Sequence, residues 1–420
     1  MNLTPLVRPA IFYLFLSLVS TNHLMALEFP EAQQAEAWLL TYGPGELYWQ
    51  RFGHNSIWIR DQERGIDHSF NFGYFDFNQP GFLKRFVQGR MLYFGAAFDP
   101  AAEIQDYQQQ GRTIRAQRLN LAPDQVLALE RYLVNAVQPE YRDYLYDYFY
   151  ANCSTRVRDA LDQALDGALH AATGEQAGEQ TIREHVNRLS WPDTWLFLGL
   201  QSALGSPIDG PATNWEEAFI PAELADMVAA FSFAGGQPLV TETLYDGRPA
   251  TVGLHAAGPV WWRYLAWGGL PALVLLAVGA LLLRNGPPGR SYALLSLAWP
   301  VFAGIAGSFL LYLWLGTNHA AAANNWSLLI LNPLLLAGAS WTLHKPTRAA
   351  QLIILLLVAG WLAAAGAWLL TIGQDNPSLL AFTLPLTLSS TWLIACKLHY
   401  SAAGLVLDLL VGSDHVKGST

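Results

Sequence analysis

The chain has 420 residues, of which 52% are apolar and only 14% are charged. A soluble protein usually carries about a quarter charged residues, and here the apolar excess lies at the extreme N-terminus and after about residue 260. This distribution predicts one soluble domain followed by a membrane domain. The net charge of −9 argues against a nucleic-acid partner, which would require a basic face.

Residues 1–26 are typical of an export signal. Arg8 supplies a positive charge, and Ile11 to Val19 form an apolar run that suits a signal peptide better than a spanning helix. Leu24-Met25-Ala26 offers a cleavage site, and an uncleaved N-terminal anchor is the alternative. We therefore expect the domain that follows, residues 27–260, to be exported.

The exported domain has the mixed pattern of an α+β fold. Short runs of alternating apolar and polar residues predict strands, whereas helical spacing of apolar residues predicts helices. A turn at Asp61–Gly65 joins the first two strands into a hairpin. The predicted strands are Asn55–Arg60, Ile66–Phe72 and Ile114–Leu119, and the predicted helices are Ala32–Leu40, Asn78–Phe86, Pro123–Val137 and Ala160–Leu169.

Cys153 is the first candidate for chemistry. It follows Asn152, a favoured N-cap type, and the apolar residues after it predict a helix that starts at the cysteine. The free N–H groups and partial positive charge of a helix N-terminus lower the pKa of a thiol and can hold an oxyanion. The alternative is a small, inert core cysteine. A disulfide framework is excluded, because the second cysteine, Cys396, lies in the last apolar run.

His54 is the candidate base, because it opens a predicted strand directly after a glycine. A cysteine nucleophile needs a base within hydrogen-bonding reach, and the base needs a group that orients it. If the hairpin turns near Gln62–Glu63, Asn71 faces His54 and is the expected orienting group, whereas a one-residue slip would bring Phe72 there. Two alternatives for this role lie on the same strand: Asp67 and His68.

A stretch rich in proline, glycine and aromatic residues, Leu204 to Pro221, is either a packed surface loop or part of a substrate cleft. The sequence contains no Gly-x-Ser-x-Gly elbow, no His-Glu-x-x-His, no phosphate-binding loop and no clustered metal ligands. It therefore predicts neither a cofactor nor a metal site.

Five apolar runs follow residue 260, each about long enough to cross a bilayer. The loops Arg284–Arg290 and His344–Arg348 each hold two Lys or Arg residues, whereas Gly316–Asn325 and Gly373–Ser378 hold none. By the positive-inside rule the basic loops are cytoplasmic, which puts the exported domain in the periplasm. The runs are Tyr264–Leu283, Leu294–Leu315, Trp326–Leu343, Ala349–Ile372 and Leu379–Ala395, within a membrane domain of residues 261–400 and before a cytoplasmic tail of residues 401–420.

The order of the motifs, a histidine strand followed much later by Asn-Cys at a helix start, resembles the permuted papain-like thiol enzymes. More closely, the chain resembles the Lnb family of bacterial lipoprotein N-acyltransferases. The matching stretches are Phe52-Gly53-His54-Asn55, Asn71-Phe72-Gly73-Tyr74-Phe75-Asp76-Phe77, Asn152-Cys153-Ser154-Thr155-Arg156, and Leu204 to Pro221.

The resemblance implies a permuted papain-like periplasmic domain followed by five inner-membrane helices. It also implies an enzyme that moves an acyl chain from a phospholipid donor, through a thioester on Cys153, to the N-terminal amine of a lipoprotein acceptor, with His54 as base. The third member of the site is not carried over. Two alternatives remain: a papain-like peptidoglycan amidase or peptidase, and a non-catalytic envelope-binding module.

Overall fold

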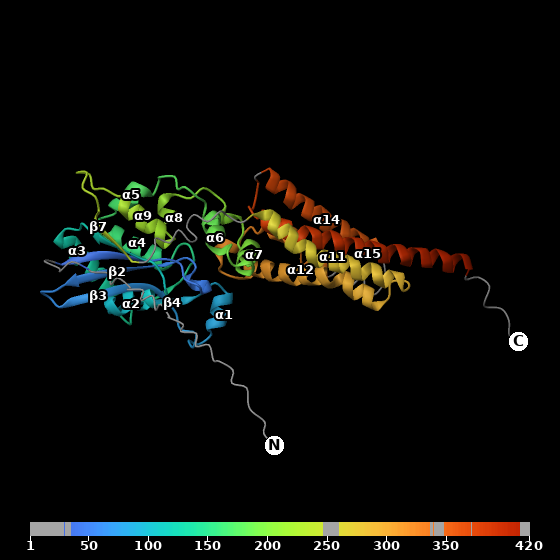
Figure 1. The fold of residues 1–420 in the computed structure, drawn as a ribbon, viewed down its shortest axis with the longest axis horizontal. Coiled ribbons are helices and arrows are strands. Elements are labelled where there is room, and N and C mark those ends of the chain that lie inside the picture. The colour runs from blue at the N-terminus through green and yellow to red at the C-terminus, as the bar shows by residue number, and fades with distance from the viewer. Residues whose placement is uncertain are drawn as a thin grey trace, which may run out of the picture.

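The computed structural model of the chain is elongated, with a mixed α/β domain at one end and long helices at the other (Figure 1). The predicted signal, residues 1–26, lies outside the described residues. The residues that the structure describes are 29, 35–246, 260–336, 339, 348–370 and 372–411.

The periplasmic domain is built on a seven-stranded sheet in the order β6-β4-β3-β2-β1-β5-β7, in which all neighbours are antiparallel. The three strands predicted from alternation are confirmed as β2, β3 and β5. The strands are β1 (Glu36–Tyr42), β2 (His54–Asp61), β3 (Ile66–Tyr74), β4 (Leu92–Phe98), β5 (Ile114–Leu119), β6 (Asp143–Leu145) and β7 (Val240–Asp246).

The helix predicted for Ala32–Leu40 is wrong, because the described part of this segment belongs to β1. All seven residues of β1 are buried, since the strand lies in the middle of the sheet with β2 and β5 on either side. A strand covered on both faces loses the alternation that marks a half-exposed strand. Its apolar run then cannot be told from a buried helix by periodicity alone.

Helices cover both faces of the sheet. Helix α2 contacts β3 and β5, while α3, α4 and α9 contact β1, β2 or β3. The predicted helix Pro123–Val137 is confirmed as α3, whereas the predicted helix Ala160–Leu169 is broken near Gly167, where φ is +80°. The helices are α1 (Phe82–Val87), α2 (Pro100–Gln109), α3 (Pro123–Ala136), α4 (Cys153–Ala164), α5 (Ala168–Thr173), α6 (Ile182–Ser190), α7 (Thr194–Ala203), α8 (Asn214–Glu217) and α9 (Pro221–Ala230).

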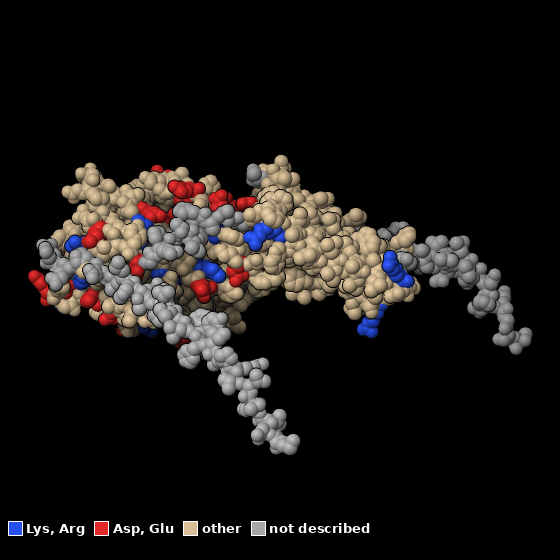
Figure 2. Space-filling view, viewed as in Figure 1, with Lys and Arg blue, Asp and Glu red and all other residues tan. Residues whose placement is uncertain are grey.

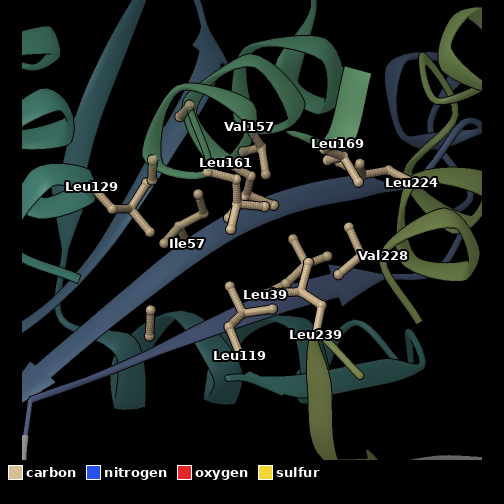
Figure 3. Close-up of a cluster of buried hydrophobic side chains, with 14 of the residues drawn as sticks. Leu39, Ile57, Leu119, Leu129, Val157, Leu161, Leu169, Leu224, Val228 and Leu239 are labelled. Atoms are coloured by element: carbon tan, nitrogen blue, oxygen red, sulfur yellow. The ribbon is translucent and has the colours of Figure 1, made fainter. Parts of the chain in front are cut away.

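The main core fixes α4 on the sheet. Val157 and Leu161 of α4 project towards Leu39 and Ile57 of the two central strands (Figure 3). Each such side chain contributes about 1.5–3 kcal/mol when it is fully buried. The packing therefore holds α4, and with it Cys153 at its first turn, rigidly on the strands that carry the rest of the site.

The membrane half contains α11 (Trp261–Arg284), α12 (Arg290–Gly316), α14 (Arg348–Leu369) and α15 (Pro377–Val411). Among the residues that the structure describes, three helices are long and apolar enough to cross a membrane: α11, α12 and residues Pro377–Lys397 of α15. The face of the membrane half that Figure 2 shows carries almost no charge, in contrast to the periplasmic domain. The fourth predicted span corresponds to α14, and the third begins as the 3-10 helix η4 (Trp326–Leu329), with its later part outside the described residues.

The two halves are joined by hydrogen bonds from the loops that the charge pattern placed outside the cytoplasm. The N–H of Gly205 donates to Ala321 O over 2.7 Å, and Gln374 Nε2 donates to Leu204 O over 2.8 Å. Asn325 Nδ2 reaches Ser202 O at 2.8 Å. The loop Gly316–Asn325 thus contacts the periplasmic domain.

Candidate active site

Cys153 is the first residue of α4, as the sequence predicts. The side chain of Asn152 caps the helix by accepting hydrogen bonds from Ser154 N and Thr155 N, each over 2.9 Å. Its Nδ2 donates to Phe219 O over 2.9 Å, which ties the cap to a distant segment. The cap satisfies two of the unpaired helix N–H groups, and the partly buried thiol lies beside them.

The surroundings of Cys153 favour the thiolate. Burial alone would raise the pKa of the thiol. The charge of His54, a hydrogen bond from its ring, and hydrogen bonds from the backbone N–H groups of Asn55 and Ser154 outweigh burial and hold that pKa below its usual value. A thiol with a lowered pKa next to a histidine is the arrangement of an activated nucleophile.

His54 is shifted in the opposite direction. Burial alone would lower the pKa of its ring, but the charge of Cys153 and hydrogen bonds to Cys153 and Asn71, together with the charge of Glu103, raise it. Nε2 of His54 lies 2.7 Å from Oδ1 of Asn71. This bond leaves Nδ1 for the thiol. The opposed shifts favour an imidazolium–thiolate pair.

Asn71, which the sequence predicts to orient His54, contacts the ring of that residue, although the predicted register is wrong by two residues. The sheet pairs Asn71 with Ser56 rather than with His54, because the turn takes four residues between Asp61 and Ile66. Side chains of a strand alternate between faces, so a slip of two residues keeps Asn71 on the same face. It reaches His54 along the diagonal.

The two alternatives to Asn71 do not orient His54. Asp67 accepts a hydrogen bond from Trp58 Nε1 over 2.6 Å, and His68 pairs across the sheet with Ile59 and is exposed. Both lie nearer the hairpin turn than Asn71. The contact found for Nε2 of His54 is therefore made by Asn71.

Gly73 provides room for the thiol. Its φ is +94°, a conformation that other residues rarely adopt. A Cβ at this position would lie 3.4 Å from Cβ of Cys153. The pairing of β3 with β4 is also irregular between Asn71 and Tyr74. The glycine thus lets β3 bend beside α4 and brings the strand against the cysteine.

Two family models match the chain: the Lnb N-terminal periplasmic domain over residues 27–188, and the Lnb transmembrane domain over residues 270–401. The chain belongs to the Lnb family. Its periplasmic part carries Cys153, His54 and Asn71, and its membrane part follows. No curated protein and no solved structure matches the chain.

One residue of this Lnb-family site has no signal in the sequence. Glu103 on α2 is buried, with 8% of its surface exposed, and its two carboxylate oxygens accept hydrogen bonds of 2.9 Å from Asn71 Nδ2 and Ser56 Oγ. Because Nδ2 of Asn71 donates to the carboxylate, Oδ1 faces His54. Asp99-Pro100, an N-cap residue before a proline, is a signal that locates α2, but no pattern shows which carboxylate faces the sheet.

The end of the stretch Leu204 to Pro221 supports the start of α4 in the Lnb-family chain. Ser154 Oγ donates to Ala218 O over 2.7 Å, and Phe219 O accepts from Asn152. Ala218 and Phe219 are buried. This end of the stretch is therefore part of the framework of the site and not a plain surface loop.

Proposed function

We propose that this Lnb-family chain is a membrane-bound thiol acyltransferase, which moves an acyl chain from a phospholipid to the N-terminal amine of a lipoprotein. The observation that carries the proposal is the pairing of Cys153 with His54, in which the thiol pKa is lowered and the imidazole pKa is raised. Asn71 holds the ring in place.

In the first half-reaction the thiolate of Cys153 attacks the ester carbonyl carbon of the phospholipid. A C–S bond forms, and the carbonyl oxygen becomes an oxyanion beside the backbone N–H groups of Asn55 and Ser154, which point at the sulfur. The ester C–O bond then breaks. The imidazolium of His54 gives its proton to the departing lysophospholipid oxygen, so an acyl-thioester remains.

In the second half-reaction the amine of the acceptor attacks the thioester. The now neutral His54 takes a proton from the amine as the C–N bond forms, and the C–S bond breaks to return the thiolate. Two moderate steps replace one difficult aminolysis of an ester. The same His54 acts first as acid and then as base.

The membrane half supports a substrate that resides in the bilayer. Its loops bind the periplasmic domain at Gly205 and Leu204, so the domain is held against the outer surface of the membrane. Both the phospholipid and a lipid-modified N-terminus lie at that surface. Because the thiol and its substrates are held at the same surface, they need not find one another by diffusion through solution.

The proposal is tested by intact mass spectrometry of the full-length protein after incubation with phospholipid vesicles. We expect a mass gain of one acyl chain that hydroxylamine removes, since a thioester is sensitive to it. The matched variants are C153S, which should gain nothing, and C396S, which removes the other cysteine and should keep the adduct.

Absence of the adduct from the wild type would contradict the proposal. Hydrolysis of peptidoglycan fragments that is lost in C153S would support the amidase or peptidase alternative instead. Tolerance of C153S in an envelope-binding assay, with no turnover in either protein, would support a non-catalytic module.

A further inference from the structure

The periplasmic domain exposes a group of large apolar side chains, here called the α1 patch. The exposed fraction is 71% for Leu83, 63% for Phe77 and 58% for Trp49. A contiguous exposed apolar surface of this kind marks a contact site for another protein or for a membrane. The members of the α1 patch are Leu47, Tyr48, Trp49, Phe77, Leu83 and Phe86.

The patch is continuous although its residues come from separate segments. The ring of Trp49 lies 6.5 Å from that of Phe77, which lies 5.1 Å from Phe82, and Phe82 lies 6.2 Å from Phe86. The rings therefore form a single surface that spans η1 (Tyr48–Gln50) and α1.

The patch lies beside the periplasmic end of a membrane helix. The backbone N–H of Asn318 donates to Gln88 O over 2.9 Å, and His319 Nε2 lies 3.1 Å from Phe86 O. Asn318 is only two residues beyond the end of α12 at Gly316. In Figure 1, α1 lies on the side of the periplasmic domain that faces the membrane helices.

The exposed surface of α12 at this level is apolar as well. Tyr312 and Leu315 lie in its last turns before Gly316 and are exposed, as lipid-facing residues are. Tyrosine is enriched where a helix leaves the hydrocarbon region. The α1 patch thus begins where the lipid-facing surface of α12 ends.

The charges on α1 suit the same surroundings. Lys84 and Arg85 lie in its last turn, next to the apolar side chains. Basic residues beside an apolar helix face are typical of segments that lie in the interface of a membrane, where they meet lipid phosphates.

We propose that the α1 patch is inserted into the outer leaflet of the membrane, as a second attachment of the periplasmic domain besides the spanning helices. The occupant is the phospholipid bilayer itself. The argument rests on the continuity of the patch with α12, on the hydrogen bonds between α1 and the Asn318–His319 loop, and on the basic residues of α1.

A row of aromatic rings leads from the patch to Tyr146 inside the domain. Phe77 lies 4.8 Å from Phe75, Phe75 lies 4.9 Å from Tyr93, and Tyr93 lies 4.2 Å from Tyr146. Burial raises the pKa of Tyr146, and the charge of Cys153 raises it further. Entry of a donor lipid along this row would rest on the proposed function. Insertion of the α1 patch into the membrane does not depend on that function.

Insertion is tested on the full-length protein in nanodiscs of phosphatidylethanolamine and phosphatidylglycerol. In a C153S/C396S background, L83C is labelled with an environment-sensitive nitrobenzoxadiazole dye. The control is V134C, because Val134 is exposed on α3, at the end of the domain away from the membrane helices (Figure 1). Lipids that carry a nitroxide near the headgroup quench dyes in the interface.

We expect blue-shifted emission and several-fold stronger quenching for the dye at residue 83 than for the dye at residue 134. Equal quenching at both positions would overturn the proposal and would leave a soluble protein partner as the occupant of the patch. Because the background lacks Cys153, neither result depends on acyl transfer. A failure of the proposed function therefore appears only in the thioester experiment.

Discussion

Oδ1 of Asn71 lies 2.7 Å from Nε2 of His54, so a residue of β3 fixes the ring that β2 presents to the thiol. The bond also sets the tautomer, since an amide oxygen can only accept. Nε2 must therefore carry a proton, and Nδ1 is free to exchange one with Cys153. A residue of the neighbouring strand thus determines which ring nitrogen faces the cysteine.

Replacing Asn71 with alanine should lower kcat/KM while the fold is retained. The ring of His54 would lose the group that fixes its tautomer, and the loss should remain within the roughly 100- to 10,000-fold that positioned acid–base catalysis contributes. The loss is measured as the rate at which phospholipid acylates Cys153, monitored by mass spectrometry over time. An N71A variant that acylates at the wild-type rate would contradict the role given to Asn71.

The pH dependence of thiol alkylation should show the influence of His54. Because the pKa of Cys153 is lowered, its thiolate forms at a lower pH than that of an ordinary thiol, whose pKa is about 8.5. In H54A the positive charge and the ring hydrogen bond are gone, and only the backbone N–H groups of Asn55 and Ser154 still oppose burial, so the alkylation curve should move to higher pH.

The rate of reaction with iodoacetamide between acidic and alkaline pH, measured in a C396S background, gives this curve. The matched control is H68A, which removes the exposed histidine of β3 and should leave the curve unchanged. Identical curves for H54A and H68A would mean that His54 does not pair with the thiol.

Glu103 should act on Cys153 through Asn71 and His54. In E103Q one carboxylate oxygen becomes an amide NH₂ group, which cannot accept the hydrogen bond that Asn71 Nδ2 or Ser56 Oγ now donates to it. A buried donor left without a partner costs about 1–3 kcal/mol, so the melting temperature should fall.

The alkylation curve of E103Q should also move to higher pH, because the charge of Glu103 helps to raise the pKa of His54. This second measurement separates positioning from plain destabilisation. E63Q, at the exposed hairpin turn, is the control that should change neither quantity. A fall in melting temperature with an unchanged curve would limit Glu103 to a structural role.

Gly73 and Gly65 form a matched pair of positions. Both have positive φ, +94° and +65°, so alanine at either should cost at least about 1 kcal/mol of stability. Only at Gly73 would the added Cβ meet Cys153, whereas nothing lies within 4 Å of it at Gly65. We expect G73A to slow alkylation of Cys153 and G65A to leave it unchanged. Equal alkylation rates for the two variants would contradict the contact with the thiol.

The sequence predicts the parts of the site that depend on local patterns. Asn152 marks the start of α4, and the alternation along β2 and β3 places His54 and Asn71 on one face. The expected hairpin register differs from the observed one by two residues, and because the period of a strand is also two, Asn71 lies on the expected face.

The remaining parts depend on contacts between segments that are distant in the chain. Glu103 reaches Asn71 from the opposite layer of the domain, and the backbone N–H of Asn55 reaches Cys153 because of the packing of α4 on the sheet. No spacing rule predicts such contacts. β1 was interpreted as a helix for a related reason, since a strand buried on both faces has no alternation to detect.

Ala321 belongs to the loop after α12, yet it packs in the same apolar cluster as Phe149, Ile208 and Phe219 of the periplasmic domain. A fragment cut before α11 would lose this side chain and would uncover carbonyl groups that Gln374 and Asn325 now bind. The periplasmic half is therefore not an independent module on a flexible tether. Its fold is completed by loops of the membrane half, which fix its position relative to the membrane helices.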